Sequence, residues 1–241
     1  MRKTYISIAC WLLFGNALMA QLPTNRTTET IVADVLAQMP AGKLARYNKL
    51  IDDLKGTGEE GVLTLVSMMN ASEKGSNAHV DYALSGLSHY VMAKGEESAR
   101  LVIANAYLKA LDLAKDRETK AFIIRQIQIV GKDECVETLS TYLNKEDLCG
   151  PAARALAANG SENAGKVLKD ALMRHTGTPN TKKDIIVAIG EAQVEGTEEF
   201  LKELLKSGDV DMQKTILYAL GRVGTKASFK VLADAAAIDR Y

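Results

Sequence analysis

Histidines are the first candidates for chemistry in this sequence, because imidazole is the side chain that changes charge near neutral pH. The chain holds three, His79, His89 and His175, and none has a serine or cysteine near it in a recognisable nucleophile motif. The glycines follow apolar helical stretches without a phosphate-loop pattern, so helix-ending turns account for them. We therefore predict no catalytic residues, no cofactor-binding residues, no cofactors and no metal ligands, and we interpret the chain as non-enzymatic.

Cysteine is the other side chain with reactive potential. Cys10 lies in the apolar amino-terminal segment, which leaves Cys135 and Cys149. Each is placed near the start of a predicted helix, and two such antiparallel helices would hold the cysteines about 10 Å apart along the stack, beyond bonding range. No histidine stands at ligand spacing from either cysteine. Two separate thiols are the favoured interpretation, and a disulfide or a metal pair is the alternative.

Residues 1–20 have the features of a secretory signal peptide. Arg2 and Lys3 precede the apolar run 5–14, and Ala20 offers a small residue before the expected cut. The apolar run is shorter than the roughly 20 residues that a membrane-spanning helix needs. We therefore expect an exported protein, periplasmic or extracellular in a bacterium, with no integral membrane segment after signal removal.

The charge balance limits the possible partners. Acids and bases number 30 each in the full chain. Removing residues 1–20 takes away Arg2 and Lys3 but no acid, which leaves a slight excess of acids. A nucleic-acid binder carries a strongly basic surface instead, so we predict no nucleic-acid partner.

Helical periodicity follows a short polar stretch. Residues 21–30 are predicted to be a linker, with a helix starting near Thr30. From there to residue 241, apolar residues recur at the three-and-four spacing of amphipathic helices. Thr57 and Glu60 have the spacing of a capping box. The stripes expected to be buried in the first half of this region are Leu44, Tyr47, Leu50, Ile51 and Leu54; Val80, Ala83, Leu84, Leu87 and Val91; and Leu101, Val102, Ala104, Tyr107, Leu108 and Leu111.

Four turns in the second half can be superposed. They end at Gly131, Gly160, Gln193 and Gly224. Eight residues beyond these ends stand Leu139, Leu168, Leu201 and Leu232, and each turn is preceded at a fixed distance by Ile123, Ala152, Ile185 and Ile216. A unit repeated at about thirty residues predicts stacked pairs of helices.

The clearest copy of this unit shows a family resemblance. The stretch Asp209–Gly224 resembles the short HEAT-like repeat also found in phycobilisome lyases, with its acidic turn, its basic residue inside the first helix and its Ala-Leu-Gly ending. Lys214 stands where the family prefers arginine, and Gln193 replaces a turn glycine. The resemblance implies an all-α fold over residues 31–241: a right-handed α-solenoid of about six stacked antiparallel helix pairs, a HEAT-like or armadillo-like superhelix. It implies the holding of other molecules and no chemistry by itself.

The second helices of the last four repeats carry two rows of polar residues. The first row is Glu137, Lys166, Glu199 and Lys230, and the second contains Asp170, Glu203 and Asp234. If these helices line the concave face, the alternating signs of the first row predict an ion-pair ladder between repeats, and the second row predicts an acidic strip that touches a partner. The alternative is a solvated face, on which each exposed pair contributes about 0–1 kcal/mol.

The carboxy-terminal helix is expected to expose apolar surface. Repeat arrays need terminal units with a polar outer face, and no further helix follows this one in the sequence. Phe229, Leu232 and Ile238 are therefore predicted to form a contact edge for a following domain, a protein partner or a second copy of the chain.

These features together favour an exported, non-enzymatic protein-interaction scaffold. The alternative is the amino-terminal interaction module of a larger secreted enzyme, because arrays of this kind resemble the leading regions of secreted proteins that continue into a sugar-processing domain similar to 3-keto-glycoside hydrolases. A lyase of the phycobilin type is disfavoured, since export removes the chain from that pathway.

Overall fold

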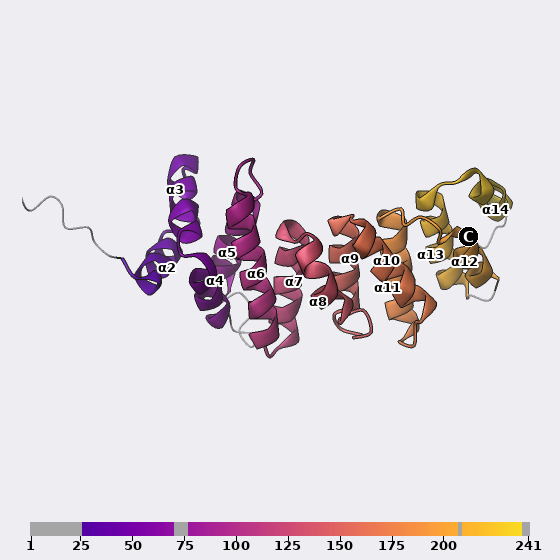
Figure 1. Ribbon diagram of the computed structural model, residues 1–241, viewed down its shortest axis with the longest axis horizontal. Helices are drawn as coiled ribbons and strands as arrows, with labels where there is room; N and C mark the ends of the chain where they lie inside the picture. The colour runs from indigo at the N-terminus through magenta and orange to yellow at the C-terminus, as the bar shows by residue number, and fades with distance from the viewer. Residues whose placement is uncertain (1–25, 70–76, 207–208, 238–241) are drawn as a thin grey trace, which may run out of the picture.

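The computed structural model describes residues 26–69, 77–206 and 209–237, and these residues form an all-α structure, as predicted. They fold into 13 α-helices and one short 3-10 helix, without a strand. Figure 1 shows the helices in one elongated row that follows chain order from the amino-terminal to the carboxy-terminal end. The predicted signal peptide, residues 1–20, lies outside the described residues.

Most helices come in pairs joined by short turns. Their bounds are α2 (Thr28–Ala37), α3 (Leu44–Lys55), α4 (Gly58–Ser67), α5 (Ala78–Tyr90), α6 (Glu97–Leu113), α7 (Arg117–Val130), η1 (Asp133–Cys135), α8 (Val136–Ser140), α9 (Cys149–Asn159), α10 (Glu162–Met173), α11 (Pro179–Glu191), α12 (Glu198–Leu205), α13 (Val210–Val223) and α14 (Lys226–Ala236). The first helices α7, α9, α11 and α13 pack directly on one another in sequence. The second helices lie against them: α8 and α10 contact α9, and α12 and α14 contact α13. Chain order thus becomes spatial order along the row.

Five of the described helices, α2, α7, α10, α11 and α13, begin after a residue whose side chain caps the first turn. The backbone N–H groups in the first turn of a helix lack partners inside the helix, so an oxygen acceptor just before it stabilises the start. Asp116 accepts from the amide of Thr119 at 2.7 Å, and Asp209 accepts from the amide of Met212 at 2.8 Å. Thr178 caps α11 in the same way, and Pro179 takes the first helical position, where its missing N–H group costs nothing. The predicted start near Thr30 is two residues late, because Thr27 caps α2 and places Thr28 inside the helix.

Three of the four superposed turns end in the left-handed backbone region. Gly160 and Gly224 have φ values of 67° and 68°, which glycine adopts without a Cβ clash. Gln193 takes the same region at φ 50° and its side-chain amide donates to the carbonyl oxygen of Arg222 at 3.0 Å. The bond joins this turn to the turn that ends at Gly224. Gln193 therefore fills a glycine position and adds a link between repeats.

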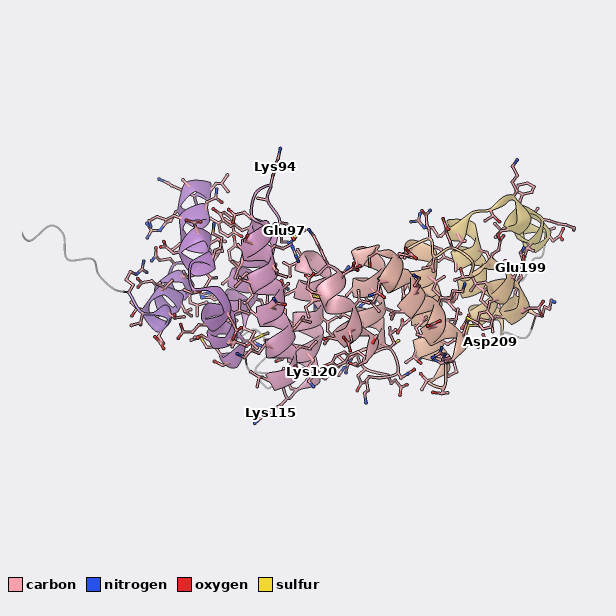
Figure 2. The ribbon with its side chains drawn as sticks, viewed as in Figure 1. Lys94, Glu97, Lys115, Lys120, Glu199 and Asp209 are labelled. Carbon is pink, nitrogen blue, oxygen red and sulfur yellow. The ribbon has the colours of Figure 1, made fainter. Side chains whose placement is uncertain are left out.

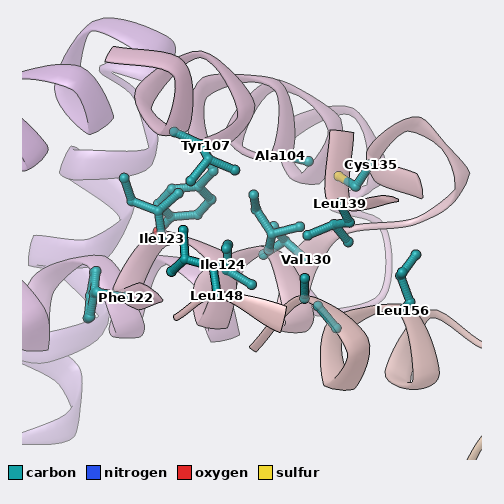
Figure 3. Packing of buried hydrophobic residues seen from close by; sticks show 14 of the residues in the cluster. Ala104, Tyr107, Phe122, Ile123, Ile124, Val130, Cys135, Leu139, Leu148 and Leu156 are labelled. Carbon is teal, nitrogen blue, oxygen red and sulfur yellow. The ribbon is translucent and has the colours of Figure 1, made fainter. Parts of the chain in front are cut away.

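The core lies between the two layers of helices, at the registered positions (Figure 3). Ile123, Ala152, Ile185 and Ile216 are each fully buried. Leu139, Leu168 and Leu201 on the second helices are buried as well, which confirms the count of eight beyond the first three turns, while Leu232 after the fourth turn is only partly buried. Small residues bring the first helices close together: a Cβ on Gly190 would lie 2.8 Å from the Cα of Ala219. The residues that recur at fixed positions in the repeats are therefore the ones that pack in the core.

Two predictions of buried apolar residues are wrong. Leu44 is 73% exposed, because it is the first residue of α3. The apolar pattern of one helix does not show how far the neighbouring helices extend along it. Leu101 and Val102 are 42% and 45% exposed. Helix α6 packs on α4 and on α7, and these two neighbours together define its buried arc. That arc includes Ile103 and the charged Arg100 instead.

Arg100 occupies its core position because its guanidinium is fully engaged. It donates to the carbonyl oxygen of Val130 at the end of α7 and to Glu134 at 2.6 Å, and it pairs with Glu97 at 2.8 Å. A buried arginine is tolerated when its donors meet acceptors. The group ties the first turn of α6 to the turn after α7.

The predicted capping box at Thr57 and Glu60 does not form. Thr57 has helical backbone angles, and its hydroxyl donates back to the carbonyl oxygen of Leu54 at 2.5 Å. Glu60 accepts from the hydroxyl of Thr28, also at 2.5 Å. Thr57 serves the end of α3 because the connection to α4 is too tight to leave it in an extended conformation.

Both remaining cysteines are buried free thiols, which confirms the interpretation as two separate groups. Burial raises the pKa of Cys135 and of Cys149 to about 12. The thiol of Cys149 lies 3.5 Å from the carbonyl oxygen of Thr181, to which it donates. Neither thiol is poised for nucleophilic chemistry, since the thiolate is the reactive form.

Candidate functional site

The charged residues predicted on the second helices find ion-pair partners within their own helices. The pairs are Lys166–Glu162 at 2.6 Å, Glu199–Lys202 at 3.0 Å and Lys230–Asp234 at 2.7 Å. Glu137, on α8, has no ion pair among the described residues. Side chains three or four residues apart on one helix are closer than side chains on helices whose axes lie about 8–10 Å apart. The predicted ladder between repeats is therefore absent from the described residues.

The predicted acidic strip is exposed but partly neutralised. Glu203 pairs with Lys206 at 2.7 Å, and Asp234 pairs with Lys230. Asp170, on α10, is exposed and has no ion pair among the described residues. Exposed pairs of this kind contribute about 0.3–0.5 kcal/mol each. The second-helix face thus presents alternating charges that largely cancel one another.

The carboxy-terminal helix is poorly covered. Phe229 is 73% exposed, while Val231 and Leu232 are only partly buried. The third residue of the predicted edge, Ile238, lies outside the described residues. Figure 1 shows α14 at the end of the row, beside α12 and α13. Phe229 with its partly buried neighbours makes this helix a candidate contact surface, because contiguous exposed apolar patches are typical of interaction sites.

A polar anchor holds α14 in place. The carboxylate of Glu198, on α12, accepts from the hydroxyl of Thr225 at 2.5 Å and from the hydroxyl of Ser228. These hydrogen bonds, the one from Ser228 most of all, lower the pKa of Glu198. Lys202 lies 3.6 Å from the same carboxylate. The last helix is therefore attached by a charge-assisted cluster as much as by apolar packing.

A row of bases on the first helices was not predicted. It consists of Arg125 on α7, Arg154 on α9, Lys183 on α11 and Lys214 on α13. The two arginines stand two residues after the registered core residue of their helix, and the two lysines stand two residues before it. A helix turns about 100° per residue, so a position two residues before or after a core residue lies on the opposite side of the helix. Both positions therefore point away from the core. Arg125, Arg154 and Lys214 are exposed and Lys183 is partly exposed. We call these four residues the basic row.

None of the four bases forms an ion pair with another described residue, although two acids lie nearby. Burial raises the pKa of Asp81, and Arg125 partly offsets that rise; Asp184 stands in the same relation to Arg154. The Asp184 carboxylate lies against Gly150, where a Cβ would be 3.0 Å from Oδ2. These partly desolvated acids reduce the local positive charge without cancelling it.

Exposed tyrosines stand on α13, which carries Lys214, and on α5, which packs on α7. Tyr218 on α13 occupies the same register position as the two arginines and is 47% exposed. Tyr82 on α5 is 42% exposed and meets the ring of Tyr47 edge-on, with centroids 5.7 Å apart. Tyrosine and arginine are the residues enriched in protein interfaces. The same count that located the core could have revealed this face from the sequence, had it been extended by two residues either way.

The histidines do not assemble a reactive group in the described part of the chain. His79 and His89 are exposed. His175 shares a hydrogen bond of 2.8 Å with the hydroxyl of Thr181, and its pKa is lowered, mainly by burial and also by Lys182. No three metal-ligating side chains come together in residues 26–69, 77–206 and 209–237.

Comparison of the chain with protein-family models, with curated proteins and with solved structures finds no match in any of the three. The helices described by the structure also include none with the length and apolar character needed to cross a membrane. The chain's own helices define the class as an all-α protein, with most helices joined in pairs by short turns.

Proposed function

We propose that the protein is an exported, non-enzymatic scaffold that binds other proteins through a right-handed α-solenoid of the HEAT-like type. Six helix pairs support the architecture, from α3 with α4 to α13 with α14, preceded by α2. Each unit packs on its neighbours in sequence, which is how repeat arrays gain stability. The elongated row offers two long faces to partners (Figure 1).

The observation that carries the binding role is the exposed apolar surface of α14. Phe229 is 73% exposed at the end of the row, on a helix whose attachment depends on the Glu198 cluster. Burying the phenylalanine ring in a partner would gain roughly 1.5–3 kcal/mol. A following domain of the same polypeptide, as in the larger secreted enzyme considered above, would satisfy the same surface as well as a separate protein or a second copy.

Site-specific cross-linking in the host tests this role. A photoreactive phenylalanine at position 229 is expected to form one defined adduct in the cell envelope. The matched control places the same group at Leu113, which is 64% exposed and lies at the end of α6. Adducts at neither position, with the protein free in solution by light scattering, would contradict an interaction role.

Export has its own test. The protein recovered from the envelope of its host should begin at or near Gln21, because residues 1–20 would be removed on passage through the membrane. Mature, soluble protein that still carries residues 1–20 would contradict export while leaving the scaffold proposal standing.

A further inference from the structure

The basic row is a periodic line of unpaired charge. Arg125, Arg154, Lys183 and Lys214 come from four first helices that contact one another in order. Helices packed through small residues lie about 8–10 Å apart, so the three intervals between the four helices span about 24–30 Å. Their long side chains can adjust along the line by a further turn of helix. The spacing between helices follows from the repeat, while the four-residue difference between the arginine and lysine positions shifts them by about 6 Å along the helix axis.

The two faces of the array differ in how their charges are used. Lysines on the second helices are held by carboxylates three or four residues away, as in Lys166 with Glu162 and Lys206 with Glu203. The basic row has no such partner among the described residues. Asp184 and Asp81 are the acids that approach it, from α11 and α5, and both remain beyond ion-pair distance of the arginines. The bases are therefore free to meet carboxylates supplied from outside.

We propose that the first-helix face binds an extended, acidic polypeptide segment of a partner protein, with its carboxylates paired to the basic row. The proposal rests on the scaffold function above and names the chemistry of one of its partners. An extended chain in the polyproline II conformation has three residues per turn and a rise of about 3.1 Å per residue. Acidic side chains at every third position therefore lie on one face about 9 Å apart and match the helix spacing. Tyr218 and Tyr82 would pack on the two ends of such a segment.

The same observations disfavour a nucleic acid. Acids and bases balance over the chain. Four charges at about 9 Å intervals offer fewer contacts than the roughly 6–10 phosphates that a typical nucleic-acid binder neutralises. Asp184 and Asp81 interrupt the face between and beside the bases, where a continuous phosphate backbone would meet them. A polypeptide can leave those positions neutral.

The test uses a labelled twelve-residue peptide with glutamate at every third position, Gly and Ser elsewhere, and fluorescence anisotropy with the chain from residue 21 onward. Measurements at about 0.01 M ionic strength keep the charge interactions, because the Debye length is then about 30 Å. The quadruple variant R125Q, R154Q, K183Q, K214Q is expected to bind about 4- to 600-fold more weakly than the unmodified chain, since each of the four exposed charge pairs changes affinity by roughly 1.4- to 5-fold. The charge-retaining variant R125K, R154K is expected to stay within about threefold.

A matched control removes four other exposed bases without ion pairs: Lys94, Lys115, Lys145 and Lys226, each changed to Gln. Figure 2 shows Lys94 and Lys115 at opposite edges of the array, so these control residues do not form a single row. The control therefore lowers the net charge by the same amount and leaves the basic row intact. It is expected to bind the peptide within about twofold of the unmodified chain. Circular dichroism checks that both variants are folded.

Three results would overturn the inference: no peptide binding by the unmodified chain, equal loss in the two quadruple variants, or tighter binding of a single-stranded oligonucleotide of equal charge than of the peptide. Cross-linking at position 229 in the host separates this failure from failure of the scaffold proposal. If a defined adduct forms there but the peptide does not bind, the scaffold proposal stands and the proposed role of the basic row is refuted.

Discussion

Leu201 offers the sharpest test of the packing, because helix α12 depends on it. It is fully buried, and it is the one buried residue among the eight of α12. Shortening a fully buried leucine to alanine costs about 2–5 kcal/mol through lost burial and the cavity left behind. The loss falls on a short helix whose remaining apolar residues are only partly covered. Leu201→Ala should therefore loosen α12 while the middle of the array stays closed.

Hydrogen exchange followed by mass spectrometry measures this locally. A change of 1.4 kcal/mol is tenfold, so amides of α12 should exchange about 30- to 4,000-fold faster, up to the limit set by their own opening free energy. Helix α14 should follow, because its anchor Glu198 lies on α12. Helices α7 and α9, which make no substantial contact with α12, should be unchanged.

The control is Lys202→Ala, at the adjacent position. Lys202 pairs with Glu199 at 3.0 Å and with Glu198 at 3.6 Å, within the same helix. Such pairs contribute about 0.3–0.5 kcal/mol each, so exchange should rise by no more than about fivefold. Equal effects of the two substitutions, or unchanged exchange of α12 in Leu201→Ala, would refute the register that places Leu201 in the core.

Three further outcomes are expected. Glu198→Gln should weaken the attachment of α14: the folded pKa of Glu198 is lowered from 4.5, so its contribution is complete above 4.5 and is lost as the pH falls through the folded value. Exchange of α14 amides measured against pH should show that loss in the unmodified chain and not in the variant. Gly224→Ala should destabilise the fold by roughly 1–2 kcal/mol, because alanine is strained at a φ of 68°. Gly221→Ala should stabilise it by up to about 1 kcal/mol, because Gly221 lies inside α13 with open space around it. Melting temperatures that change in the same direction for both variants would contradict the turn geometry. Burial raises the pKa of Cys135 and Cys149 to about 12. A thiol reagent at pH 8 should therefore leave both unmodified in the folded chain from residue 21 onward and modify both in denaturant. Rapid labelling of the folded protein would contradict the burial of the thiols.

The resemblance to a HEAT-like repeat and the structure address different levels of the fold. The all-α content and the packing register are observed at particular residues, such as Ile185 and Leu168, both fully buried. The handedness of the superhelix and its family remain proposals, because the residues that suggested them lie in a single well-formed copy, Asp209–Gly224. Gln193 shows why the other copies are harder to recognise, since a non-glycine residue there adopts the glycine conformation.

The sequence by itself determined the periodic features of the second half of the chain. Which residues face the core depends on angular position about one helix, and a three-and-four stripe reports that position directly. Ile123 and Ile216 are buried for this reason. The cap at Thr178 and the turn at Gly224 follow equally from local chemistry, because their partners lie within four residues.

Only the tertiary structure decided which neighbours a residue meets. Arg100 is buried and Leu101 exposed because α6 packs between α4 and α7, and a single helix carries no record of that arc. Lys166 pairs inside its own helix and not across repeats, because the distance to the adjacent helix exceeds the distance to Glu162. The basic row likewise depends on first helices that stack closely enough to bring Arg125 and Arg154 into one line. Periodicity fixes a residue's direction from its own axis, and packing decides what lies in that direction.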